Sequence, residues 1–100
     1  MAIVEDPEEI ETTALHELVD FKDRAVLEIG CGEGRLTWRY AEKTAHVTAI
    51  DPKAKDIQTA QANLPDLLKG RVGFVESTIE DFATSAGERR FDIALFAWSL

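Results

Sequence analysis

An α/β fold built around a parallel sheet is predicted by the order of apolar runs and helical patterns along the chain. Residues 25–29 form a short apolar run, residues 30–34 contain three glycines, a helical pattern follows, and a second apolar run leads into Asp51. Strand, glycine turn, helix and strand make one βαβ unit, because parallel strands need a helical crossover between them. Apolar runs at 71–76 and 91–97 predict two further strands.

The glycine turn and Asp51 of this βαβ unit have the features of a nucleotide-binding site. In parallel α/β sheets, ligands bind at the carboxyl ends of the strands. Glycines are needed in such a turn because it uses positive φ and because a Cβ would hold a ligand away from the backbone. Asp51 lies 21 positions after Gly30, close to the roughly 20-residue offset at which an acidic side chain reaches ribose hydroxyls. These features predict a cofactor that contains adenosine.

Glycine spacing and one acidic residue distinguish between such cofactors. The dinucleotide fingerprint G-x-G-x-x-G would place its third glycine at position 35, where the chain has Arg35, whereas its third glycine is Gly34. Glu28 would also add negative charge beside a pyrophosphate. A ligand with a cationic end fits better, and an NAD(P)-dependent oxidoreductase is the less favoured alternative.

The stretch VLEIGCGEGRLT at residues 26–37 resembles the first motif of the class I S-adenosylmethionine-dependent methyltransferases. The resemblance implies that the glycine loop holds the methionine part of the cofactor, that Glu28 helps to hold its ammonium group, and that Asp51 binds the ribose hydroxyls. The residues that it implies for cofactor binding are Glu28, Gly30, Cys31, Gly32, Gly34, Asp51, Pro52, Thr78, Ile79, Glu80, Ala97 and Trp98. S-adenosylhomocysteine is the product that the same site would hold.

The adenine side of this site is implied by two further segments. Pro52 stands where the family has an apolar residue that packs on the adenine ring. Residues 77–82 resemble the segment that reads the base: Thr78 would accept from the adenine amino group, the Ile79 backbone N–H would donate to the ring, and Glu80 is a second acceptor. The alternative is that Glu80 simply supplies favourable charge at the start of a helix. The polar residues that follow, 83–90, are expected to form a loop or a frayed turn.

The carboxyl end of the last predicted strand is expected to lie next to the substrate. Residues 91–97 resemble the family's fourth motif, in which Ala97 and Trp98 point into the site and Asp92 lies at the opposite end of the strand. The residues after the strand do not match the Asn/Asp-Pro-Pro-aromatic stretch of the nucleic-acid base methylases. A small-molecule methyl acceptor is therefore expected. No catalytic residue is assigned, since no base with a proton-transfer partner is visible.

The family resemblance implies a Rossmann-like three-layer αβα sandwich. The resemblance implies that the chain would cover only the cofactor half of a seven-stranded sheet, with strand order 3-2-1-4 for the part present. Residues 1–100 would form one partial domain, with a loose arm at 1–5, a helix to residue 20, and four βα units over 25–100. Strand 91–97 would then be an uncovered edge, which predicts self-association.

Amino-acid composition and net charge limit the kinds of partner and the cellular location expected for the chain. Eleven basic and 19 acidic residues give a net charge of −8, which argues against a nucleic-acid surface. One cysteine excludes an intrachain disulfide, and no Cys/His cluster has metal-ligand spacing. No apolar run reaches the length of a membrane span, and the acidic N-terminus is unlike a signal peptide, so a cytoplasmic protein is expected. The predicted function is methyl transfer to a small molecule, with a non-catalytic module that binds S-adenosylmethionine or S-adenosylhomocysteine as the alternative.

Overall fold

A parallel sheet forms the centre of the protein in the computed structural model, which describes residues 2–6, 16, 19–87 and 89–97. The sheet is five-stranded, in the order β1-β5-β2-β3-β4, and every paired neighbour is parallel. The strands are β1 (Ala2–Asp6), β2 (Ala25–Ile29), β3 (His46–Asp51), β4 (Val72–Glu76) and β5 (Ile93–Ala97). The helical elements are α2 (Thr37–Tyr40), η1 (Ala41–Lys43), α3 (Ala54–Ala62), η2 (Asp66–Leu68) and α4 (Ile79–Ser85).

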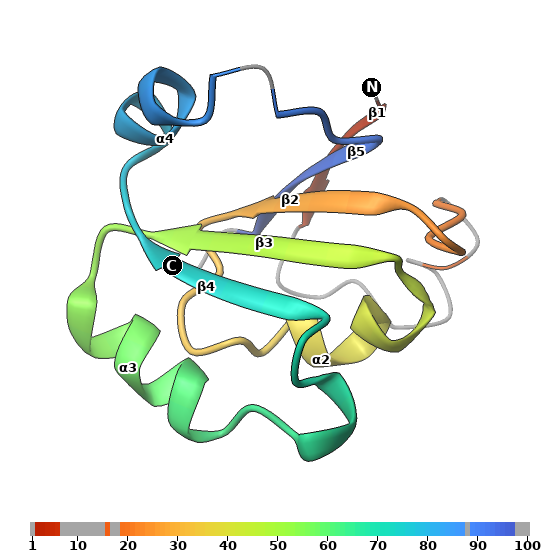
Figure 1. The fold of residues 1–100 in the computed structure, drawn as a ribbon, viewed down its shortest axis with the longest axis horizontal. Helices are drawn as coiled ribbons and strands as arrows, with labels where there is room; N and C mark the ends of the chain where they lie inside the picture. The colour runs from red at the N-terminus through yellow and green to blue at the C-terminus, as the bar shows by residue number, and fades with distance from the viewer. Residues whose placement is uncertain (1, 7–15, 17–18, 88, 98–100) are drawn as a thin grey trace.

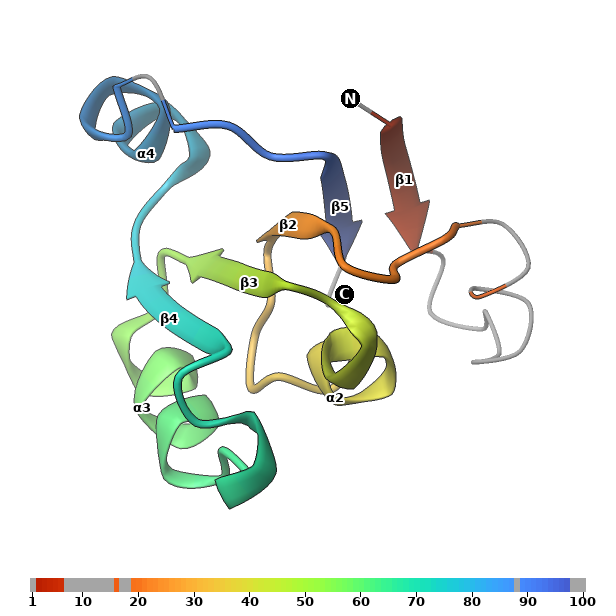
Figure 2. The same cartoon turned by 45° about the vertical axis from the view of Figure 1, so that its right-hand side comes forward.

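Helices cover both faces of the sheet and make three layers. α2 and α3 lie on one face, and α4 lies on the other (Figure 1). The turned view shows the same separation, with the glycine loop leaving the end of β2 toward α2 (Figure 2). β4, β3, β2 and β5 follow one another across the sheet, so the predicted αβα sandwich with strand order 3-2-1-4 is confirmed.

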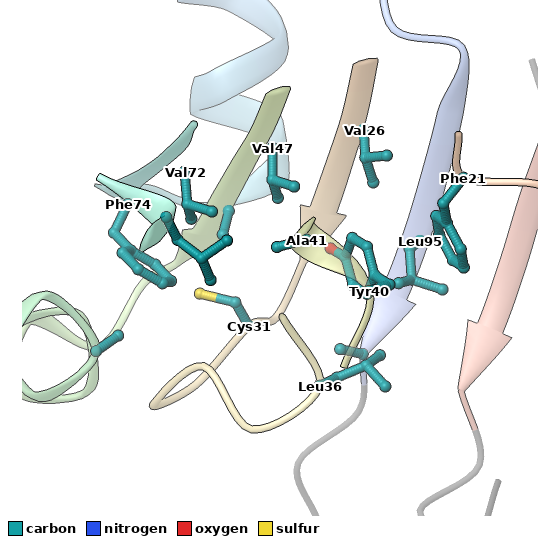
Figure 3. Packing of buried hydrophobic residues seen from close by; sticks show 14 of the residues in the cluster. Phe21, Val26, Cys31, Leu36, Tyr40, Ala41, Val47, Val72, Phe74 and Leu95 are labelled. Carbon is teal, nitrogen blue, oxygen red and sulfur yellow. The ribbon is translucent and has the colours of Figure 1, made fainter. Parts of the chain in front are cut away.

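The larger hydrophobic core lies between the sheet and the α2/α3 layer. Inward-facing residues of neighbouring strands meet there, and Tyr40 and Leu36 enter from the helix side (Figure 3). Tyr40 stacks on Phe21 with ring centroids 4.5 Å apart. A smaller cluster, made of Leu27, Ile50 and Phe82, lies on the α4 face. Successive strand residues point to opposite faces, which is why adjacent residues of β2 enter different clusters.

The N-terminal segment differs from the expectation. Residues 1–5 were predicted as a loose arm, but Ala2–Asp6 forms β1 and pairs in parallel with β5 over its whole length. The prediction of an uncovered edge at strand 91–97 is therefore wrong, because β1 occupies that edge and uses its free backbone groups. Self-association stays a prediction, but an uncovered edge at β5 no longer supports it. Most of the helix predicted up to residue 20 lies outside the described residues.

Asp92 has a structural role at the end of the sheet away from the glycine loop. Its Oδ2 accepts a hydrogen bond from the Ala25 N–H at 2.9 Å, and its own N–H donates to the Ala25 carbonyl at 2.8 Å. The two bonds tie the start of β5 to the start of β2. Within the described part of the chain, no helix has the length and apolar character needed to cross a bilayer.

Candidate functional site

The glycine loop between β2 and α2 depends on backbone conformations that other residues rarely adopt. Gly30, Gly32 and Gly34 have φ of +78°, +55° and +93°. A Cβ on Gly30 would lie 2.6 Å from the carbonyl oxygen of Ala97, and a Cβ on Gly34 would lie 2.6 Å from the Trp38 ring. The loop thus passes close to the end of β5, and only glycine permits this approach.

Backbone and carboxylate groups at the end of β3 hold this loop in place. The N–H groups of Gly30 and Cys31 donate to the Ile50 carbonyl at 2.9 and 3.1 Å. Asp51 is 6% exposed; its Oδ2 accepts from the Gly32 N–H at 3.0 Å and its Oδ1 from the Lys53 N–H at 2.9 Å. The carboxylate predicted to bind ribose therefore lies directly beside the glycine loop.

The Cys31 thiol is an inert part of the loop. Cys31 is 4% exposed, and burial, followed by the nearby Glu28 and Asp51 carboxylates, raises the pKa of its thiol. A thiolate is the reactive form of cysteine, so this environment suppresses its nucleophilicity at neutral pH. Its side chain fills space between the loop and the α2/α3 core (Figure 3).

A cavity of about 260 Å³ lies at the carboxyl ends of β2, β3 and β4, on the α4 face of the sheet. Three isoleucines provide apolar walls, and polar groups come from the segment after β4. The lining residues are Ile29, Gly30, Ile50, Pro52, Ser77, Thr78, Ile79 and Glu80. Sites for drug-sized ligands usually enclose about 300 to 1,000 Å³. This cavity therefore accommodates one part of a cofactor, such as a planar base.

The cavity contains five of the predicted residues, namely Gly30, Pro52, Thr78, Ile79 and Glu80. Ile29, Ile50 and Ser77 also line the cavity, although they were not predicted as site residues. Ile29 and Ile50 are apolar residues at the ends of β2 and β3, and each directly precedes a predicted site residue. Successive strand residues point to opposite faces of the sheet, so Ile29 lies on the face opposite Glu28. This alternation could have identified the two isoleucines as walls of the cavity.

The segment after β4 forms a capped helix. Thr78 is the N-cap of α4, and its hydroxyl accepts from the Asp81 N–H at 3.1 Å. Glu80 and Asp81 lie in the first turn, so the expected helix start is confirmed, while the role of Glu80 as an acceptor for adenine stays a prediction. The expected loop at 83–90 is wrong at its beginning, because α4 continues to Ser85. Phe82 anchors the helix in the smaller core, which local sequence polarity does not reveal.

Glu28 lies on the other face of β2 and does not line the cavity. Its side chain is fully buried. Its Oε1 accepts hydrogen bonds from the Thr37 hydroxyl at 2.8 Å and the Tyr40 hydroxyl at 2.5 Å. Ala97 is buried, with its carbonyl oxygen against Gly30. Trp98, the remaining predicted residue, lies outside the described residues.

Tyr40 is the only tyrosine of the chain, and its ionisation should report on this buried cluster. Burial, and next the Glu28 carboxylate, raise the pKa of Tyr40 well above its usual value. A raised pKa in the folded state stabilises the fold below the unfolded pKa of about 10, and this stability is lost as pH rises further. In an absorbance titration at a tyrosinate wavelength, Tyr40 should ionise only together with alkaline unfolding. Smooth ionisation near pH 10 in the folded protein would contradict the buried cluster.

A second hollow, of about 550 Å³, lies at the amino-terminal ends of the strands. It is larger than the cavity above, but none of the charged residues that line it in the described part of the chain is buried. Its lining residues are His16, Val19, Asp20, Phe21, Lys22, Asp23 and Lys43, of which only Val19 and Phe21 are buried. Ligands of parallel α/β sheets bind at the opposite end. The smaller cavity is therefore the candidate site.

Comparisons with known proteins agree with this geometry. The family described as "Methyltransferase domain" matches residues 26–100. The ubiquinone biosynthesis O-methyltransferase of Serratia proteamaculans is 36% identical over 72 residues, 71% of this chain and 29% of that protein. The malonyl-[acyl-carrier protein] O-methyltransferase of a Paenibacillus species is 32% identical over 79 residues, 73% of this chain and 29% of that protein. A crystal structure of a Listeria monocytogenes protein described as a S-adenosylmethionine-dependent methyltransferase aligns with a TM-score of 0.68 and 26% identity, over 85% of this chain and 40% of that one.

The chain belongs to the class I S-adenosylmethionine-dependent methyltransferase family. The predictions of family, fold and cofactor are thereby confirmed. The chain spans less than a third of the length of the curated relatives described above.

Proposed function

We propose that this chain binds S-adenosylmethionine at the carboxyl ends of β2, β3 and β4, as the cofactor-binding part of a methyltransferase. The observation that carries the proposal is the meeting of three features at one edge of the sheet. The glycine loop, the Asp51 carboxylate and the cavity lined by Ile29, Ile50 and Ile79 adjoin one another there.

The residues present fit such a cofactor. Ile29, Ile50 and Ile79 offer apolar surface to the faces of a base, and Pro52 adds an apolar ring at the exposed rim. Glu80 supplies an oxygen acceptor for an amino group, and the Ile79 N–H belongs to the first turn of α4, where backbone donors have no partner within the helix. Asp51 remains the proposed partner of the ribose hydroxyls.

When bound, the cofactor supplies an activated methyl group on a sulfonium. The chain's own contribution is to position this group, which is catalysis by proximity. The rigid end of β3 fixes the loop through the Ile50 carbonyl and Asp51. The cavity walls exclude water from one side of the ligand. No residue is assigned as a base.

For the acceptor we propose a small molecule methylated on oxygen. Two relatives are named as O-methyltransferases, which supports oxygen as the acceptor atom, and one of them is named for ubiquinone biosynthesis, which supports a small molecule. The net charge of −8 disfavours a phosphate-tracking surface. A cytoplasmic location stays a prediction, as does the division of the domain at residues 20 and 25.

The cavity wall gives a direct test of where the cofactor binds. Replacing Ile79 with Ala removes apolar surface from the cavity and should weaken S-adenosylhomocysteine binding roughly five- to tenfold, the value of about one kcal/mol of lost contact. Leu67→Ala is the matched control, because Leu67 is 73% exposed and lies elsewhere. Calorimetric titration of both variants measures the effect. Equal affinities for the two variants would place the ligand outside this cavity.

A further inference from the structure

Glu28 is a buried carboxylate in the middle of the sheet. It lies on β2, between Ala49 of β3 and Leu95 of β5 in register, and it is 0% exposed. Its backbone is fixed by strands on both sides, so its side chain starts from a rigid position. A carboxylate in such a place requires hydrogen-bond donors, because an unpaired buried charge is strongly unfavourable.

Two described donors come from one short helix. Thr37 and Tyr40 are three residues apart on α2, hence on one face of it, and both hydroxyls donate to Glu28 Oε1. α2 has four residues, no side-chain N-cap bond and no acidic residue in its first turn. A single turn of helix is not stable by itself, because nucleation is unfavourable. Its position therefore depends on tertiary anchors such as these.

The cluster of Glu28, Thr37 and Tyr40 brackets the glycine loop. Glu28 stands two residues before Gly30, and Thr37 stands three residues after Gly34. The loop between them contains three glycines with positive φ, so its backbone has many alternative conformations to lose. Joining its two ends through one carboxylate oxygen restricts these conformations.

We propose that Glu28 is a positioning residue, which fixes the glycine loop for the cofactor by holding Thr37 and Tyr40 and does not itself touch the ligand. This inference rests on the proposed cofactor site. It differs from the role that the family resemblance implies for Glu28, contact with the cofactor ammonium. The structure supports the indirect role because the Glu28 side chain is 0% exposed and points to the α2 face, where its Oε1 accepts hydrogen bonds from the Thr37 and Tyr40 hydroxyls.

The test compares matched variants in calorimetric titration with S-adenosylhomocysteine, at a temperature where circular dichroism shows every variant folded. Thr37→Val and Tyr40→Phe each remove one hydroxyl and should weaken binding about tenfold. Thr44→Val is the control, since Thr44 is a buried threonine whose hydroxyl donates to the Ala41 carbonyl and not to Glu28. Glu28→Gln should stay within about threefold of the parent chain, because its amide oxygen accepts the same two bonds.

A second readout is independent of any ligand. Amide hydrogen exchange at residues 31–36 should be faster in Thr37→Val and Tyr40→Phe than in Thr44→Val. Parent-level affinity and exchange in the first two variants would overturn the proposal. So would a Glu28→Gln variant that binds as poorly as Glu28→Ala, because that result indicates direct contact of the charge with the ligand. If the parent chain binds no S-adenosylhomocysteine, the proposed function fails, and the exchange rates still decide whether Glu28 positions the loop.

Discussion

Replacing Gly30 with Ala should abolish detectable S-adenosylhomocysteine binding and destabilise the fold by roughly 2 to 5 kcal/mol. The new Cβ would lie 2.6 Å from the carbonyl oxygen of Ala97, a backbone atom that cannot rotate away. The φ of +78° adds strain for any residue with a Cβ. Relief requires the loop to separate from the end of β5, which moves the wall of the cavity. Denaturant unfolding and calorimetric titration measure the two effects.

Gly70→Ala separates the clash from the strain. Gly70 also has positive φ, +85°, but a Cβ there would meet no atom within 4 Å. This variant should lose only the conformational cost, about 1 to 2 kcal/mol, and should bind as the parent chain does. If Gly30→Ala and Gly70→Ala have the same unfolding free energy and the same ligand affinity, the close approach of the loop to β5 contributes to neither stability nor binding.

Asp51→Ala should reduce S-adenosylhomocysteine affinity by at least about a hundredfold and the free energy of unfolding by roughly 3 kcal/mol. The carboxylate accepts from two backbone N–H groups, those of Gly32 and Lys53. Its removal leaves the buried Gly32 N–H without this acceptor and also removes the proposed ribose ligand. Loop position and ligand contact are lost together, which is why both the affinity and the stability fall.

Two control variants separate the possible causes of the Asp51→Ala effect. Asp51→Asn keeps an oxygen acceptor for one of the two N–H groups, so it should recover part of the stability and less of the binding. Asp66→Ala removes an exposed aspartate that pairs with Lys69 at the surface, and its stability should stay within about 0.5 kcal/mol of the parent chain. An Asp51→Ala variant as stable and as tightly binding as Asp66→Ala would contradict the role assigned to Asp51.

The central βαβ unit could be predicted because its signals are local. Apolar runs, glycines that require positive φ, and the offset from Gly30 to Asp51 are all contained in 27 consecutive residues, 25–51. The buried faces also follow from local period: Leu36, Tyr40 and Ala41 pack inward as the helical spacing indicates. For these elements, local preference and tertiary packing agree.

The parts that sequence reasoning missed depend on distant partners. β1 becomes a strand because the edge of β5, some 90 residues later, offers unpaired backbone groups. Residues 83–85 are helical because Phe82 packs in the smaller core. The strand period gives the face of Glu28, but its hydrogen bonds with the Thr37 and Tyr40 hydroxyls require the folded position of α2. Non-local contacts of this kind override local propensity.

The most direct test of the whole account is a calorimetric titration of the folded chain with S-adenosylhomocysteine, with NAD as the comparison ligand. We expect saturable one-site binding of S-adenosylhomocysteine and none of NAD, because the glycine spacing and Glu28 disfavour a pyrophosphate. Binding of NAD in preference to S-adenosylhomocysteine, or binding of S-adenosylhomocysteine that survives both Gly30→Ala and Asp51→Ala, would contradict the assignment of this site.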